Sequence, residues 1–403
     1  NFAEELEGYS PHLTSLISGL NYANRPAGLS LRDLTDFVDV QDMARWRERL
    51  MQAIHIGFLI DDHGNEIPLS AEHGIDMLGS LLEASFDSRN LEYYGNLHNS
   101  GHVMMARIHD PDGRYKENPG VMSDTSTSLR DPIFYRYHRF IDNLFQEYKA
   151  TLPIYEKKDL DFPGVNIVNV TVNAKVPNVV NTFMKDSLLE LSHGISMKGQ
   201  VKVKYEHLSH DPFTYSISVE NTTGGAKQAT VRIFLGPIHD ELGNRFQLNE
   251  QRRFFIELDK FRSELQPGKN TITRKSSESS VTVSRTPSFS QLQAGEGVSE
   301  DLTEYCSCGW PEHMLVPRGT HKGMDFYLFV MLTDYDQDGV NGLGGSALCS
   351  DAVSYCGAKD QKYPDKKPMG FPFDRVIKAR TIAEFSTTNM SFTDVKVQFK
   401  ERA

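Results

Sequence analysis

The chain of 403 residues has no long apolar run and no excess of basic residues. Its longest apolar stretch, Phe326–Leu332, is far shorter than the roughly 20 residues that an apolar helix needs to span a bilayer. Lys and Arg total 43 against 54 Asp and Glu, which gives a formal net charge of −11. The sequence therefore predicts no membrane segment, and its acidity disfavours wholesale binding to nucleic acid or to anionic lipid.

Several catalytic motifs are also missing. The sequence contains no glycine-rich phosphate loop, no nucleophile elbow and no segment in which basic and aromatic residues alternate. Hydrolase, kinase and RNA-binding functions therefore have no support. The composition is that of a folded protein, with 39% hydrophobic and 24% charged residues, and the length favours two or three domains.

Cysteine is scarce, and all four cysteines lie in the last quarter of the chain: Cys306, Cys308, Cys349 and Cys356. Residues two apart in a strand share a face, so a bond between the first two would be strained. Of the three possible connectivities, the two that link Cys306 and Cys308 to the later pair are favoured. We prefer Cys306–Cys349 with Cys308–Cys356. A four-thiolate zinc site is the alternative, although its usual C-x₂-C pairs are absent.

Three glycosylation sequons are compatible with secretion, although such triplets also arise by chance. They begin at Asn169, Asn221 and Asn389.

The hydrophobic period changes partway along the chain. Apolar residues recur at helical spacing in the first 150 residues, and one helix is predicted to open with the N-cap Asp131 followed by Pro132. Beyond Pro153 they alternate, which predicts many short strands in a β-sandwich or barrel. The sequence thus predicts an α+β chain with a helical domain over residues 1–155 and a β domain over residues 156–403. The expected helices are 39–56, 73–85, 91–108 and one that opens at 131.

Three histidines stand out in the helical half. His98 and His102 are one helical turn apart, about 6 Å along the axis, on a face that also carries Leu91, Tyr94 and Met105. His138 lies on the apolar stripe of the helix that begins after Asp131. A lone core histidine is usually just hydrogen-bonded, but three such side chains on two neighbouring helices indicate a metal site. His109 is seven residues beyond His102, about 10 Å along the axis, and is excluded.

The ligand set does not by itself identify the metal. A zinc protease would place Glu directly after the first histidine as a general base, whereas this chain has Asn99. Three imidazoles suit copper, zinc or iron.

Two long segments carry a family resemblance. Residues 93–102, YYGNLHNSGH, and residues 122–142, MSDTSTSLRDPIFYRYHRFID, closely resemble the copper-B half of arthropod haemocyanin, and the chelicerate subunits in particular. Residues 305–315, YCSCGWPEHML, and 370–375, GFPFDR, resemble the C-terminal β domain of that family. The resemblance covers nearly the whole chain.

This resemblance implies a type 3 copper site. In such proteins three histidines hold each of two coppers, and dioxygen binds reversibly between the ions as peroxide. His98, His102 and His138 match the three copper-B ligands. The resemblance also implies an immunoglobulin-like β domain stapled by disulfides, secretion into the extracellular haemolymph, and oxygen transport by hexamers or multiples of hexamers of like or related subunits.

One half of that centre is not found in this sequence. Before His98 the chain has histidines at positions 12, 55, 63 and 73, and no two of them are four residues apart. With Asn1 as its first residue and no leader, we expect the chain to be a processed or C-terminal part that lacks the N-terminal, copper-A portion. Such a chain should not bind dioxygen reversibly by itself, because each of two coppers supplies one electron.

Two other functions of this family need different features. A latent phenoloxidase, or catechol oxidase, would use the same copper centre with room for a phenol; Phe145 is a candidate pocket wall, and Glu83 and Asp124 are candidate bases. A storage hexamerin keeps the fold but usually loses copper ligands, and the three retained histidines count against it. Residues 334–339, DYDQDG, match the start of an EF-hand loop but are better explained as an acidic surface loop, because Gly345 replaces the terminal Glu.

Overall fold

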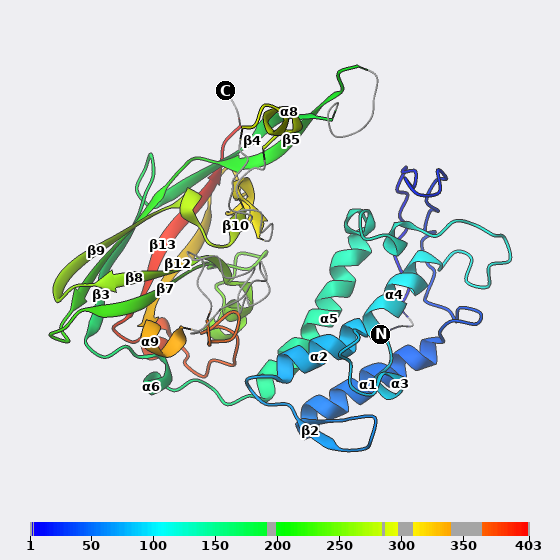
Figure 1. Ribbon diagram of the computed structural model, residues 1–403, viewed down its shortest axis with the longest axis horizontal. Helices are drawn as coiled ribbons and strands as arrows, with labels where there is room; N and C mark the ends of the chain where they lie inside the picture. The colour runs from blue at the N-terminus through cyan, green and yellow to red at the C-terminus, as the bar shows by residue number, and fades with distance from the viewer. Residues whose placement is uncertain are drawn as a thin grey trace. The chain divides into compact units, whose positions relative to one another are not determined.

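The computed structural model describes residues 2, 4–191, 199–283, 287–296, 309–339 and 365–401. The chain divides into two compact units, Asn1–Pro153 and Ile154–Ala403 (Figure 1). The order of helices first and strands afterwards confirms the predicted α+β organisation. Within the described ranges, none of the helices combines the length and the apolar character that crossing a membrane requires.

The first unit is helical, with a small hairpin formed by β1 (Phe58–Ile60) and β2 (Glu66–Pro68). Its helices pack around one core, in which Met43, Leu50 and Leu97 are almost fully buried. Residues 4–38 precede them as an extended arm held by isolated bridges, including Tyr9 with Arg25. The helices are α1 (Val40–Ile56), α2 (Gly74–Glu83), α3 (Leu91–Tyr94), α4 (Leu97–Ala106) and α5 (Pro132–Thr151), with the short η1 (Val121–Ser123) and η2 (Ser128–Arg130) before α5.

Two ends of these helices follow from local chemistry. The Asp131 side chain accepts a hydrogen bond from the Ile133 N–H, and Pro132 occupies the first turn, so α5 begins where the sequence predicts. The helix predicted over 91–108 is instead broken at Gly95, which has a φ of +72°. A Cβ atom there would overlap the Trp46 indole, so this contact and the left-handed backbone both require glycine. Tyr94 and Met105 are buried, whereas Leu91 is 45% exposed.

The second unit is a β-sandwich. Its larger sheet has the order β5-β4-β13-β12-β7-β8 and its smaller sheet the order β3-β6-β9. Most neighbours are antiparallel, but β13 pairs with β4 in parallel. The larger sheet consists of β4 (Val179–Glu190), β5 (Lys202–His210), β7 (Lys227–Pro237), β8 (Ile256–Leu265), β12 (Met324–Asp334) and β13 (Met390–Phe399); the smaller consists of β3 (Val165–Asn173), β6 (Thr214–Asn221) and β9 (Gly268–Lys275).

The two sheets bury a common core, because their inward residues belong to one apolar cluster that includes Ile217 on β6 and Val330 on β12. A second cluster, rich in phenylalanine, lies around Phe234 and Phe329. The short elements of this unit are α6 (Lys157–Leu160), α7 (Leu248–Gln251), η3 (Arg252–Phe254), η4 (Ser276–Glu278), β10 (Thr282–Val283), α8 (Phe289–Gln293), β11 (Trp310–Pro311), η6 (Glu312–Met314), α9 (Tyr335–Asp338) and α10 (Ile382–Phe385).

Burial corrects two of the three glycosylation predictions. Asn221 and Asn389 are 1% and 0% exposed, and each side-chain amide donates to two backbone carbonyls. A glycan on either nitrogen would break these bonds and has no room in the folded unit. Asn169 is exposed on β3 and stays a predicted site.

Two further predictions for the second unit concern the cysteines and the acidic segment 334–339. Cys306, Cys308, Cys349 and Cys356 lie outside the described residues, so their pairing stays a prediction. In the acidic segment 334–339, the Asp338 carboxylate is buried and accepts hydrogen bonds from Arg232 and Thr333. The Asp338 carboxylate therefore belongs to an internal ion pair with Arg232.

Candidate metal centre

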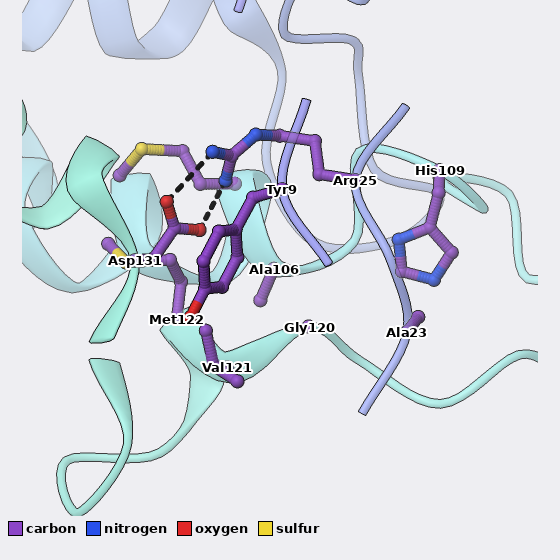
Figure 2. A pocket seen from close by; sticks show the side chains of 10 residues that line it. Tyr9, Ala23, Arg25, Ala106, His109, Gly120, Val121, Met122 and Asp131 are labelled. Atoms are coloured by element: carbon purple, nitrogen blue, oxygen red, sulfur yellow. Dashed lines mark hydrogen bonds and ion pairs between the residues drawn. The ribbon is translucent and has the colours of Figure 1, made fainter. Parts of the chain in front are cut away.

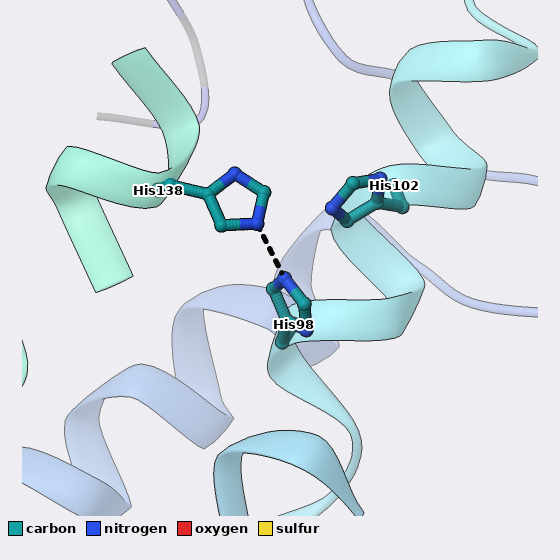
Figure 3. Close-up of side chains that lie close together, drawn as sticks. All are labelled: His98, His102 and His138. Carbon is teal, nitrogen blue, oxygen red and sulfur yellow. Dashed lines mark hydrogen bonds between the residues drawn. The ribbon is translucent and has the colours of Figure 1, made fainter. Parts of the chain in front are cut away.

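Two helices of the first unit bring the three histidines together. α4 carries His98 and His102 one turn apart, and α5 presents His138 toward them (Figure 3). Each side chain offers one ligand atom, and these three atoms all lie within 4.8 Å of one another. The Nε2 atoms of His98 and His138 are 3.0 Å apart. All three side chains are partly buried, so the cluster lies at the edge of the helical core.

The other nitrogen of each ring has a partner. His98 Nδ1 lies 3.0 Å from a Glu83 carboxylate oxygen. His102 Nδ1 is 3.0 Å from the Met122 carbonyl oxygen, and His138 Nδ1 is 2.8 Å from that of Phe134. A carbonyl oxygen can only accept, so the Nδ1 atoms of His102 and His138 must carry the protons. Glu83 favours the same tautomer for His98.

This arrangement tests whether a metal fits. A neutral imidazole has one proton, and with that proton on Nδ1 each Nε2 presents a lone pair. Two such lone pairs face one another at 3.0 Å between His98 and His138, which is unfavourable unless a cation lies near them. Three neutral imidazoles anchored through their second nitrogens are the donor set that copper or zinc requires. The site fits a transition-metal ion.

Electrostatics favours the neutral form of His102. Burial of the His102 ring lowers its pKa, and the nearby His98 and His138 lower it further, while its bond to the Met122 carbonyl acts in the opposite direction. His102 therefore keeps its lone pair at neutral pH.

Two aromatic side chains, both on α5, form the walls around the histidines. Phe134 stacks on His138 with ring centroids 3.8 Å apart, and Tyr137 stacks on His98 at 5.9 Å. The Tyr137 hydroxyl donates to the Leu97 carbonyl oxygen at 2.7 Å, which ties α5 to the start of α4. Neither residue is a site candidate in the sequence analysis. Phe134 precedes His138 by four residues and Tyr137 precedes it by one, and this spacing was the signal in the sequence that they lie near the site.

The remaining candidates fall in different places. Phe145, the predicted pocket wall, lines an apolar cavity with leucine and isoleucine side chains of α1, α2 and α5. This packing does not test its role as a pocket wall, which stays a prediction, whereas Phe134 is the side chain stacked on His138. Glu83 is at the site, but its carboxylate is engaged by His98. Asp124 accepts from Tyr22 and Ser126 and stabilises its own loop. His109, which its spacing excludes as a metal ligand, is hydrogen-bonded through Nε2 to the Asn118 carbonyl oxygen.

Comparison with family models defines the class of protein to which these units belong. Residues 2–145 match the model described as "Hemocyanin, copper containing domain", and residues 154–399 match "Hemocyanin, ig-like domain". A copper-containing helical domain is thus followed by an immunoglobulin-like domain. The chain belongs to the arthropod haemocyanin family, as its motifs predict.

Relatives from chelicerates agree with this assignment. The chain is 79% identical over 402 residues to the haemocyanin F chain of Aphonopelma sp., covering 100% of this chain and 64% of that relative. A scorpion haemocyanin structure in its activated state matches with a TM-score of 0.92 and 65% identity, over 99% of this chain and 64% of that one. The chain therefore spans about two-thirds of the length of these relatives.

A second solved structure lies further away. A haemolymph-type prophenoloxidase from a crustacean matches with a TM-score of 0.82 and 32% identity, over 98% of this chain and 59% of that chain.

Proposed function

We propose that His98, His102 and His138 hold one copper ion, and that the protein is an oxygen carrier of arthropod haemolymph in which this ion is half of a type 3 centre. The observation that carries the proposal is the convergence of three Nε2 atoms whose rings are anchored through Nδ1. The haemocyanin relatives support the choice of copper and of oxygen transport.

A type 3 centre needs a second copper ion, with ligands of its own. In the stretches of chain that the structure describes, the histidine trio is the one group of three His, Cys, Asp or Glu side chains suited to an ion. We propose that ligands for the partner ion come from a segment that this chain does not cover. The relatives further support secretion and assembly with like or related subunits into hexamers or their multiples.

The residues of the chain have separable roles in this proposal. When bound, copper supplies the reversible electron transfer on which uptake and release of dioxygen depend. The Met122 and Phe134 carbonyls and the Glu83 carboxylate fix the direction of the three rings. Phe134 and Tyr137 cover two of the rings with apolar surface, which keeps water away from the ligand atoms.

A ligand substitution tests the proposal. The His102→Gln variant of the full polypeptide should lose at least half of the bound copper, measured by elemental analysis, and its reversible absorbance change between air and argon. His73→Gln is the matched control, because the His73 side chain is 76% exposed and lies outside the trio. Equal copper content in the two folded variants would contradict the assignment.

The second candidate function is latent phenoloxidase, or catechol oxidase, activity at the same copper centre. The crustacean prophenoloxidase, which shares the fold of both units at 32% identity, favours it. Against it stands the position of Glu83, because its carboxylate accepts a hydrogen bond from His98 Nδ1 and so orients a ligand ring rather than a substrate. We therefore propose that oxygen carriage is the main function.

Catechol turnover separates the two functions. The protein should bind oxygen reversibly while oxidising catechol at a negligible rate, both before and after mild detergent or limited proteolysis. Sustained turnover after such treatment that His102→Gln abolishes would establish a latent enzyme.

A further inference from the structure

The N-terminal arm is bound to the segment that supports two of the three histidines. Residues 21–25, which we call the strap, contact residues 118–131 at four points. The Ala23 N–H donates to the Pro119 carbonyl at 3.2 Å, and Asn118 Nδ2 donates to the Asn21 carbonyl at 3.0 Å. The Tyr22 hydroxyl donates to Asp124 Oδ2 at 2.8 Å.

The fourth contact is a buried ion pair. Arg25 and Asp131 form a two-pronged pair, in which Nη2 lies 2.8 Å from Oδ1 and Nη1 contacts Oδ2, and their side chains are 6% and 3% exposed. Arg25 also donates from Nε to the Glu7 carbonyl at 2.7 Å. Figure 2 shows this pair beside a small cavity that Tyr9 and Met122 also line. Both side chains are thus held from several directions.

Two of the four strap contacts, those to Asp124 and Asp131, end next to a group that orients a histidine. Asp124 directly follows η1, whose Met122 carbonyl accepts from His102 Nδ1. Asp131 caps the N-terminus of α5, the helix that carries His138 two turns later. The same carboxylate therefore binds Arg25 and fixes the start of the helix.

We propose that the strap positions the metal centre, with Tyr22 acting on His102 through the η1 loop and Arg25 acting on His138 through the α5 cap. Tyr22 and Arg25 are positioning residues, because they touch neither the ligand nitrogens nor the ion. This inference rests on the proposed function, since it takes the histidine trio as the copper site.

Tyr22→Phe is the sharpest test, because it removes one hydroxyl and keeps the buried ring. Tyr9→Phe is its matched control on the same arm: within the described part of the chain, the Tyr9 ring contacts Arg25 but no hydrogen bond is found for its hydroxyl. Two quantities are measured in the full polypeptide: the Cu(I) dissociation constant by chelator competition, and hydrogen exchange of residues 118–138 in the copper-free protein.

The strap should affect the site more than the overall stability. Tyr22→Phe should weaken Cu(I) binding about tenfold and speed exchange around residues 121–127, while Tyr9→Phe changes neither. A residue with a merely structural role would lower the melting temperature without changing the copper affinity of the folded protein. Equal affinity and equal exchange in the two variants would overturn the proposal.

The ion pair needs a variant that folds. Arg25→Met alone leaves a buried carboxylate unpaired, whereas Arg25→Met with Asp131→Asn removes both charges and keeps a good N-cap. The double variant should show faster exchange near the start of α5 and weaker Cu(I) binding than Arg136→Met, which breaks an exposed pair between α5 and Glu4. If His102→Gln removes no copper from the protein, the proposed function is wrong. If the strap variants leave hydrogen exchange and Cu(I) affinity unchanged, only the positioning role of the strap is wrong.

Discussion

The contact between Gly101 and Tyr137 gives a prediction whose sign is opposite to that of helix propensity. Gly101 lies in α4 between the two histidines of that helix, where alanine would normally be favoured over glycine by about 1 kcal/mol. A Cβ atom there would overlap the Tyr137 hydroxyl and Cζ and stand 3.0 Å from Cε2. Because the Tyr137 ring is buried and stacked on His98, it has little room to move away.

The expected change in the free energy of unfolding combines two destabilising effects with one stabilising effect. Overpacking a buried site costs about 1–3 kcal/mol, and losing the hydrogen bond from Tyr137 to the Leu97 carbonyl costs about 1 kcal/mol more. The helix propensity of alanine offsets about 1 kcal/mol. Gly101→Ala should therefore lower the free energy of unfolding by about 1–3 kcal/mol. It should also weaken Cu(I) binding, since α4 and α5 must separate to admit the methyl group.

Gly79→Ala is the control for this prediction. Gly79 is in α2, and a Cβ atom there would meet nothing within 4 Å. It should stabilise the protein by up to about 1 kcal/mol without changing copper affinity. Urea unfolding of the copper-free protein and chelator competition measure the two quantities. If Gly101→Ala is as stable as Gly79→Ala and binds copper like the wild type, the packing argument is wrong.

Three further predictions concern the support of His98, the β unit and glycosylation. Glu83→Ala should weaken Cu(I) binding about tenfold in a chelator competition, whereas Glu72→Ala, at a glutamate 86% exposed, should leave it unchanged. Arg232→Met should lower the unfolding free energy by about 3–5 kcal/mol in urea titrations, because it leaves two buried aspartates without their arginine; a cost no larger than that of the exposed Arg262→Met would refute this. Glycopeptide mass spectrometry of the native protein should find any N-glycan of the described residues at Asn169, and a glycan at a buried sequon would contradict the packing of the β unit.

Local chemistry in the sequence predicts much of this fold. The N-cap at Asp131, the proline after it and the apolar stripe define α5, and the change from helical to alternating spacing separates helices from strands. The pair His98 and His102 follows from helix geometry alone. These features depend on neighbours within a few residues, so the sequence contains what is needed to find them.

Contacts between distant residues were harder to predict. The break at Gly95 depends on Trp46, almost 50 residues away in sequence. Phe134 and Phe145 both lie on one stripe of α5, and the sequence cannot say which end of that stripe meets the histidines. The triplet at Asn389 carries no information on burial, yet its side chain points inward to bond two carbonyls. The arm that contains Arg25 has no periodicity at all, so its role emerges only from the folded unit.

Diffraction from crystals of the native protein on both sides of the copper absorption edge is the decisive measurement of whether the three histidines hold copper. We expect an anomalous copper peak at about 2 Å from the Nε2 atoms of His98, His102 and His138, with each Nδ1 still bound to its oxygen partner. A peak that misses any one of these three nitrogens, or a histidine cluster with no copper in a protein that carries oxygen, would contradict this expectation.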